Sequence, residues 1–231
     1  MLQDMQVMDN ADAEIVSRCG SWAFEAGPVS VDPAKMLRIH GYRDLAKVRP
    51  AIRQAAEDIA LKAERIMAPK AQACRIDVVA YEENKLTLSN GTVFNDVDFE
   101  HVLDGARSVV AVVLTVGRGL DEAVIAAMDE FEPLDALFLE TAGWLGIEAA
   151  TRKFVQDLQL RVKTESVRVT RRLGPGYQYK IGGQPVNWPL EQQRLLFDVF
   201  EGVDLPVTLM ESCAMLPKMS RSGLYGLTLV N

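Results

Sequence analysis

The sequence predicts an α+β fold in which long helices pack against a mixed or antiparallel sheet. Three observations support this prediction: apolar residues recur at helical spacing over 47–67 and 132–160, strand-like runs occupy 72–90 and 108–117, and the two kinds of segment do not alternate strictly. The chain has 231 residues, of which 48% are hydrophobic and 25% charged, and this favours one globular domain. We expect a mobile N-terminal arm over 1–30 and the domain over 31–231.

Two helices are expected at the start of the domain. The first spans roughly 33–41, because Asp32 suits an N-cap, Pro33 suits the first helical position and Gly41 suits the end. The second spans roughly 47–67. Its apolar residues recur every three to four positions and form one stripe: Ile52, Ala55, Ala56, Ile59, Ala60, Ala63 and Ile66.

Strands are expected in the middle of the chain. Residues 72–90 alternate in polarity and end at a turn dipeptide, so they predict strands joined by a turn near 82–84. A short helix near 97–104 follows. The run SVVAVVLTVG, residues 108–117, is apolar throughout and predicts a central strand buried on both faces.

The second half of the chain contains the longest helical pattern. It begins at Pro133 and covers about 132–160, after a shorter helix that directly follows 117. Another helix is expected to begin at Pro189 and to run to 201. Two strand-like pieces, LPVTLM and GLYGLTLV, complete the predicted elements.

Composition excludes several classes of function. The chain has 25 Lys and Arg against 32 Asp and Glu, and its net charge of −7 argues against general nucleic-acid binding. The three cysteines are far apart and there are only two histidines, so no metal site is expected. The polar, acidic first 20 residues do not resemble a signal peptide, and no apolar run could span a bilayer. We therefore expect a cytoplasmic protein.

Charge is unevenly distributed along the chain. Residues 151–190 hold eight basic and two acidic residues, so this segment predicts either an interaction patch or an ordinary solvated helix face. The run Gly117-Arg118-Gly119 resembles the start of a dinucleotide loop, but the third glycine is missing and two acids follow. It predicts a tight strand-to-helix turn instead.

The segment RRLGPGYQYK, residues 171–180, has the composition of a ligand-binding loop. Two glycines around a proline leave a bent backbone that a ligand can approach closely. Arg172 on one side can bind a carboxylate, and Tyr177 on the other can stack or donate its hydroxyl. This set suits a zwitterion such as an amino acid, although a structural turn with a surface arginine explains the same residues.

Together with a later block, this segment resembles the reactivation domain of cobalamin-dependent methionine synthase and its short stand-alone relatives. The family pattern Arg-x-Ala/Ser-Pro-Gly-Tyr corresponds to 172–177, and a Pro-led helix follows at Pro189. The pattern Leu-Thr-Glu-Ser-x-x-Met-x-Pro-x-x-Ser-x-Ser-Gly corresponds to LMESCAMLPKMSRSG, residues 209–223. Weaker likeness extends the resemblance over most of 33–226.

The resemblance implies a vitamin B12-linked function in methionine biosynthesis. In that family the domain binds S-adenosylmethionine and docks on the cobalamin module, where oxidised cob(II)alamin receives an electron from flavodoxin or another reductase and a methyl group from S-adenosylmethionine. It implies that this chain is the reactivation subunit of a split methionine synthase, a component of a methyltransferase system, with no catalytic residue and no metal of its own.

The resemblance also assigns roles to single residues. The implied S-adenosylmethionine-binding residues are Glu148, Arg172, Gly174, Pro175, Gly176 and Tyr177. Among them, Arg172 would pair with the methionyl carboxylate, Gly174 would offer backbone groups, and Glu148 would hold the amino group. The implied cobalamin-facing residues are Tyr177, Glu211, Ser212, Ser222 and Gly223.

Three departures from the family pattern leave two other functions open. Gly174 replaces Ala or Ser, the link between Tyr177 and Pro189 is longer and predicts a hairpin turning at Gly182-Gly183, and the family's N-terminal binding aspartate and C-terminal binding tyrosine have no counterpart. One alternative is a non-enzymatic corrinoid-protein-binding module, or a chaperone of another corrinoid methyltransferase, that has lost S-adenosylmethionine binding. Another is a structural interaction domain that retains only the fold.

Overall fold

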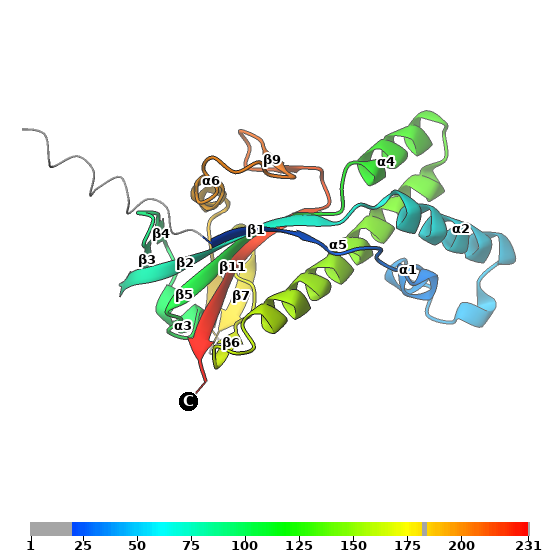
Figure 1. The fold of residues 1–231 in the computed structure, drawn as a ribbon. Coiled ribbons are helices and arrows are strands. Elements are labelled where there is room, and N and C mark those ends of the chain that lie inside the picture. Colours follow the sequence, from blue (N-terminus) through cyan, green and yellow to red (C-terminus); the bar gives the residue numbers. More distant parts are fainter. Residues whose placement is uncertain (1–19, 182–183, 231) are drawn as a thin grey trace, which may run out of the picture.

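A computed structural model describes residues 20–181 and 184–230 and shows a seven-stranded antiparallel sheet flanked by helices (Figure 1). The strand order is β4-β3-β2-β5-β11-β6, with β1 added along β2. The long central strands are β2 (Lys70–Glu82), β5 (Ser108–Thr115) and β11 (Ser220–Leu229). The outer strands are β1 (Gly20–Glu25), β3 (Lys85–Leu88), β4 (Val93–Asn95) and β6 (Val167–Val169). The predicted α+β class is confirmed.

The central strand β5 divides the interior into two cores. Every residue of β5 is buried, as the apolar run predicts. Successive side chains of a strand point to opposite faces. Accordingly, Val110 and Val112 belong to the core on one face, whereas Val109 and Ala111 belong to the core on the other.

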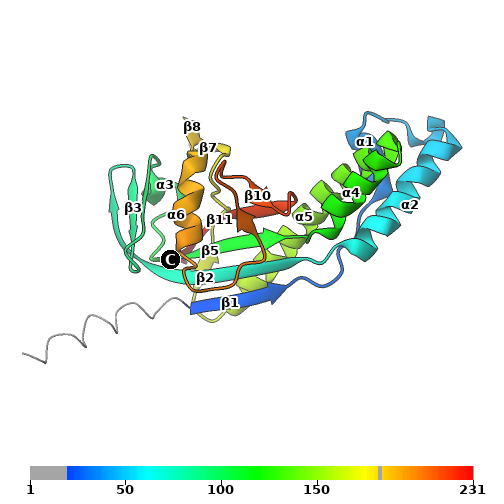
Figure 2. The ribbon, with the colours of Figure 1, turned by 90° about the horizontal axis from the view of Figure 1, so that it is seen from above.

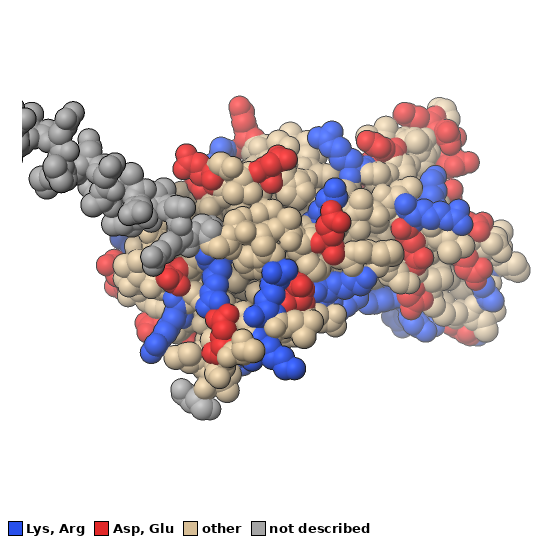
Figure 3. All heavy atoms as spheres, in the orientation of Figure 1, with Lys and Arg blue, Asp and Glu red and all other residues tan. Residues whose placement is uncertain are grey.

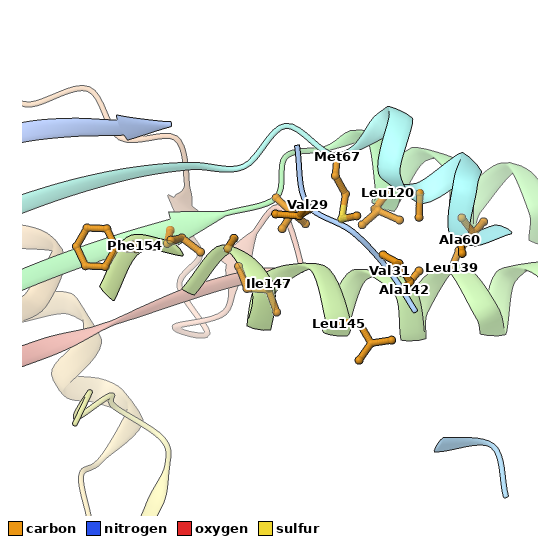
Figure 4. Packing of buried hydrophobic residues seen from close by; sticks show 14 of the residues in the cluster. Val29, Val31, Ala60, Met67, Leu120, Leu139, Ala142, Leu145, Ile147 and Phe154 are labelled. Carbon is orange, nitrogen blue, oxygen red and sulfur yellow. The ribbon is translucent and has the colours of Figure 1, made fainter. Parts of the chain in front are cut away.

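The first core lies beneath the long helix α5 (Pro133–Arg161), which crosses one face of the sheet. Beyond the end of the sheet, α5 packs with α1 (Pro33–Ile39), α2 (Pro50–Ile66) and α4 (Gly119–Asp129). These helices form a helical extension that projects from the sheet (Figures 1 and 2). Apolar side chains from α2, α4 and α5 meet between the helices of this extension (Figure 4). Gly146 of α5 leaves room for the side chain of Met67, since a Cβ on Gly146 would lie 2.3 Å from Sδ of Met67.

The opposite face of the sheet carries shorter elements. These are α3 (Phe99–Val102), α6 (Gln193–Asp198), the hairpin β7 (Gln178–Ile181) with β8 (Gln184–Asn187), and the hairpin β9 (Thr208–Leu209) with β10 (Met215–Leu216). Two 3-10 turns complete the elements, Leu45–Lys47 and Leu190–Gln192. Trp188 is fully buried here and contacts the rings of Phe94 and Phe99 edge-on, at centroid distances of 5.3 and 5.5 Å.

Most predicted elements are present, and the short strands β1, β4, β6 and β10 are additions. Asp32 caps α1 as expected, its carboxylate accepting a hydrogen bond from the amide of Ala34 at 2.8 Å. Residues 20–25, expected to belong to an N-terminal arm, instead form β1 and pair with β2, which corrects the arm's boundary. Residues 1–19 lie outside the described residues. Strand β6 was not predicted.

The predicted hairpin after Tyr177 is confirmed by the pairing of β7 with β8, although its turn at 182–183 lies outside the described residues. This hairpin and the loop before it stand beside β11, which brings the two sequence blocks of the predicted site into one region.

Candidate functional site: an Arg–Tyr–Glu cluster beside β11

The loop 171–177 is held against β11 by a short antiparallel bridge. Leu173 and Leu224 exchange backbone hydrogen bonds, with N···O distances of 2.9 and 2.7 Å. Gly223, the residue before Leu224, allows this contact, because a Cβ there would lie 2.4 Å from the carbonyl oxygen of Leu173. The bridge fixes the position of Arg172 relative to the strand.

Arg172 is held on two sides. Its Nη1 donates a hydrogen bond to the carbonyl oxygen of Ser222, and its guanidinium lies over the ring of Tyr177, 4.7 Å from the ring centroid. A cation over an aromatic face contributes about 0.5–1 kcal/mol at an exposed position. Because Ser222 offers only a neutral carbonyl, the positive charge of Arg172 is not neutralised by this contact.

Glu148 reaches the same region from α5. Its Oε1 accepts a hydrogen bond from Nη2 of Arg221 at 2.6 Å, and Nη1 of Arg221 donates to Oγ1 of Thr151 at 3.2 Å. The side chain of Arg221 is 13% exposed and that of Glu148 34%. This ion pair is therefore partly withdrawn from water, which strengthens it relative to a surface pair.

The charges around Glu148 act on its protonation. The hydrogen bond from Arg221 lowers the pKa of Glu148, burial opposes this effect, and the charges of Arg221, Arg152 and Arg172 lower the pKa further. Glu148 and Arg172, which the sequence places far apart, thus lie near enough to interact electrostatically.

The backbone of Gly174 is already engaged. Its amide donates to the hydroxyl oxygen of Tyr179 at 2.7 Å, and the same hydroxyl donates to the carbonyl oxygen of Gly174 at 3.3 Å. Burial raises the pKa of Tyr179. A Cβ on Gly174 would lie 2.2 Å from Nη1 of Arg172 and 3.0 Å from the carbonyl of Ser222, so this position accommodates no larger side chain without movement of Arg172.

Pro175 and Gly176 shape the loop rather than present side chains. Pro175 is buried, whereas Gly176 is exposed and has φ of +78°, a left-handed conformation that favours glycine. The amide of Gly176 donates to the carbonyl of buried Trp188 at 2.7 Å. The next residue, Tyr177, is 46% exposed and so presents its ring at the surface.

The residues expected to face cobalamin fall into two groups. Glu211 and Ser212 are exposed in the β9–β10 hairpin, where the carbonyl of Glu211 accepts a hydrogen bond from Arg194. Ser222 is 3% exposed and donates its hydroxyl to Oε1 of Gln193 at 2.9 Å. Gly223 is also buried, so Tyr177, Glu211 and Ser212 are the members of this set with exposed surface.

Three neighbours of this region were not predicted from the sequence. Arg221 is the variable residue of the Ser-x-Ser-Gly pattern, and Tyr179 belongs to the link that departs from the family. Buried Gln193 connects the two blocks, since its Nε2 donates to the carbonyl of Cys213 at 2.9 Å while its Oε1 accepts from Ser222. Alternation places Arg221 on the same face of β11 as Tyr225 and Leu227, which belong to the core beneath α5, but no local motif pairs it with Glu148.

The cluster combines the Glu148 carboxylate, the guanidinium groups of Arg172 and Arg221, and tyrosine rings. Tyr225, whose pKa burial raises to about 12, interacts electrostatically with Arg172 and Arg221 from the core beneath α5. An arrangement of this kind can bind an amino group, a carboxylate and a flat ring together. A pocket of about 400 Å³ lies elsewhere and is lined by none of the predicted site residues; its lining includes Lys70, Thr115 and Pro217.

Neither a metal cluster nor a membrane span was found in the described part of the chain. No group of three or more His, Cys, Asp or Glu side chains within 20–181 and 184–230 could hold a metal ion. Over the same residues, none of the helices has both the length and the apolar character needed to cross a bilayer.

Comparison with known proteins identifies the fold. No protein-family model matches the chain, and no curated protein is similar to it in sequence. Among solved structures, the chain is similar to the crystal structure of the MetH reactivation domain bound to AdoHcy, with 15% sequence identity and a TM-score of 0.59. The match covers 94% of this chain and 81% of that one. The resemblance seen in the two sequence blocks thus extends to the three-dimensional structure, and the chain has the fold of the MetH reactivation domain.

Proposed function

We propose that this chain binds S-adenosylmethionine and acts as the reactivation subunit of a split cobalamin-dependent methionine synthase in the cytoplasm. The single observation that carries this proposal is the meeting of Glu148, Arg172 and Tyr177 beside β11 in a chain with this fold. The similar structure holds AdoHcy, which differs from S-adenosylmethionine only in lacking the transferable methyl group and its charge.

The residues present fit such a ligand. Its α-carboxylate suits the guanidinium of Arg172, which has only a neutral carbonyl as hydrogen-bond acceptor. Its amino group suits Glu148, whose lowered pKa keeps the carboxylate charged at neutral pH. Its adenine ring suits the exposed face of Tyr177.

The contribution of this chain to the reaction is positioning. S-adenosylmethionine would supply the methyl group, and cobalamin carried by another protein would receive it. Arg172 and Glu148 would fix the two ends of the amino-acid moiety, and the braced loop at Gly176 would fix the nucleoside side. Holding two reactants in a defined orientation removes much of the entropic barrier to a bimolecular transfer.

The exposed residues Tyr177, Glu211 and Ser212 mark the face that we propose to dock on the cobalamin module. A flavodoxin or another reductase would supply the electron for reductive methylation of cob(II)alamin. No residue of this chain is assigned to acid–base chemistry, so the proposed role is that of a component of a methyltransferase system.

Calorimetric titration with S-adenosylmethionine tests ligand binding. We expect the wild-type chain to bind, and we expect Arg172→Ala to weaken binding about tenfold or more through loss of the charge-assisted contact to the carboxylate. Arg171→Ala is the matched control, because Arg171 is an exposed neighbour with no described contact to the cluster. Equal affinities for wild type and Arg172→Ala would contradict the assignment.

A second candidate function is a corrinoid-protein-binding module without S-adenosylmethionine binding. It is favoured by the internal partners of the proposed ligand groups: Arg221 on Glu148 and Tyr179 on Gly174. This function predicts association with a cobalamin-carrying protein but no heat on titration with S-adenosylmethionine. Measurable binding of S-adenosylmethionine would reject this second function.

A further inference from the structure

The Glu148 carboxylate already has a cationic partner in this chain. Nη2 of Arg221 lies 2.6 Å from Oε1 of Glu148, the distance of a strong charge-assisted hydrogen bond. The amino group of an amino-acid ligand would make the same kind of contact with the same carboxylate. The proposed ligand and Arg221 therefore contact the same carboxylate.

We propose that Arg221 is a specificity-determining residue that competes with the ligand's amino group for Glu148, so that an aminoacyl ligand binds only by displacing the Arg221 guanidinium. This inference rests on the proposed function and adds to it an element that the sequence patterns leave undefined, since Arg221 occupies a variable position of the Ser-x-Ser-Gly block.

The geometry allows this exchange. Glu148 is about one third exposed, so a ligand can reach the carboxylate from solvent, whereas Arg221 is more deeply buried in β11. Nη1 of Arg221 also donates to Oγ1 of Thr151 at 3.2 Å, and this contact does not involve the carboxylate. Arg221 thus retains a polar partner after its bond to Glu148 is broken.

The energetics explain what the pair contributes to the ligand-free protein. A partly buried carboxylate without a partner loses hydration and gains nothing in return. Arg221 compensates this loss while the site is empty. The ion pair also discriminates between ligands. A ligand without an amino group cannot replace the interaction of Arg221 with Glu148, so it leaves these two residues paired.

The other positive charges near Glu148 do not act in this way. Arg152 and Arg172 lower the pKa of Glu148 through their charge, but no hydrogen bond joins either of them to its carboxylate among the described contacts. Arg172 instead contacts the carbonyl of Ser222 and the ring of Tyr177. Arg152 therefore provides a control for removal of a nearby positive charge without release of Glu148.

Calorimetry with two matched ligands distinguishes competition by Arg221 for Glu148 from the effect of removing a nearby positive charge. The ligands are S-adenosylhomocysteine and its desamino analogue, which retains the adenosine and the carboxylate. We expect Arg221→Met to bind S-adenosylhomocysteine about tenfold more tightly than wild type, and to bind the desamino analogue with unchanged affinity. We expect Arg152→Met to resemble wild type with both ligands. Adding Glu148→Gln to Arg221→Met should abolish the gain.

Thermal melts establish that each variant is folded, and Arg221→Gln replaces Arg221→Met if the latter does not fold. Wild-type binding of S-adenosylhomocysteine with unchanged or weaker binding by the Arg221 variant would overturn the competition and leave the proposed function intact. A gain of the same size for the desamino analogue would also overturn it. Absence of S-adenosylhomocysteine binding by wild type and by every variant would overturn both the competition and the proposed function.

Discussion

At the scale of single residues, the site depends on a glycine that allows two backbones to meet. Gly223 lies in β11 opposite Val112 of β5 and beside Leu173 of the ligand loop. A side chain at this position would separate the loop from the strand and would move Arg172, whose Cγ lies 2.9 Å from the ideal Cβ position. The placement of the cluster is therefore coupled to the packing of the sheet.

We expect Gly223→Ala to destabilise the protein by about 1–3 kcal/mol, because the new methyl group overpacks a site bounded by backbone. Urea unfolding followed by circular dichroism measures the effect. Gly20→Ala is the control, since no atom lies within 4 Å of a Cβ built on Gly20. Equal unfolding midpoints for Gly223→Ala and wild type would show that the loop is not held against β11 as described.

A second prediction concerns the pH dependence of stability through Glu148. Its pKa is lower in the folded protein than the usual value of 4.5, chiefly because of the hydrogen bond from Arg221. The ionised carboxylate therefore contributes stability that is fully present above pH 4.5 and is lost as the pH falls through the lowered pKa.

The variant Glu148→Gln has no carboxylate at this position and lacks this contribution. We expect the unfolding free energy of wild type relative to Glu148→Gln to be constant at neutral pH and to decrease in acid. Urea unfolding of both proteins between about pH 7 and pH 3 measures the difference. A difference that stays constant to the acid limit would refute the lowered pKa.

How far the sequence predicts the site also becomes clear at this scale. Arg172 and Tyr177 are neighbours in a recognisable block, and in the structure the Arg172 guanidinium lies over the Tyr177 ring. Glu148 has no local motif, and only the packing of α5 brings it near them. Arg221 was missed because its role depends on that same packing, which adjacent residues do not encode.

At the scale of elements, β1 is a strand whose alternating pattern is too short to predict it from the sequence. Trp22 and Phe24 are two residues apart and both turn toward α5, where Phe24 contacts Phe154 edge-on at 5.5 Å and Arg161 lies over Trp22 at 5.3 Å. The alternation was present in the sequence but spans only six residues. Strand β6 has three residues and could not be predicted, since its identity comes from pairing with β11.

The turn between α4 and α5 carries an unfavourable residue. Helix α4 ends in a Schellman motif, in which the amide of Glu132 donates to the carbonyl of Ala127 at 2.8 Å and Phe131 adopts φ of +60°. Glycine is the usual residue at this left-handed position. The Phe131 side chain is 91% exposed, so it gains almost nothing from burial.

We therefore expect Phe131→Gly to stabilise the protein by about 0.5–1 kcal/mol, because removal of the left-handed strain outweighs the greater flexibility of glycine in the unfolded chain. Differential scanning calorimetry should show a higher melting temperature. Phe131→Ala is the control, since alanine removes the ring but retains the strained Cβ. A lower melting temperature for Phe131→Gly would show that the left-handed conformation of Phe131 does not destabilise the turn.

At the scale of the whole molecule, the structure modifies the interpretation of charge. The segment 151–190 is basic in sequence, yet Arg161 pairs with Asp157, Arg168 pairs with Asp104, and Lys153 donates to two backbone carbonyls. On the face shown in Figure 3, basic and acidic side chains are interspersed. Arg172, in the same segment, contacts a neutral acceptor, the carbonyl of Ser222, so its charge is not neutralised by this contact.

The sequence indicated the fold class because hydrophobic periodicity depends on local spacing, and it suggested a ligand loop over 171–177 because glycine, proline and arginine are adjacent there. It could not show that the buried side chain of Ser222 belongs to a network with Gln193 and the Cys213 carbonyl, since those residues meet only in the folded chain. The proposed docking face is therefore limited to the residues of this set that are exposed, Tyr177, Glu211 and Ser212.

The most direct test of the central claim is anaerobic absorption spectroscopy of a methionine synthase cobalamin module that lacks its own reactivation domain. The module is prepared as cob(II)alamin and supplied with a reductant and S-adenosylmethionine, with and without this chain. We predict faster return of methylcobalamin when the wild-type chain is present, and a smaller acceleration with Arg172→Ala. The same rate of return with and without the chain would contradict its assignment as a reactivation subunit.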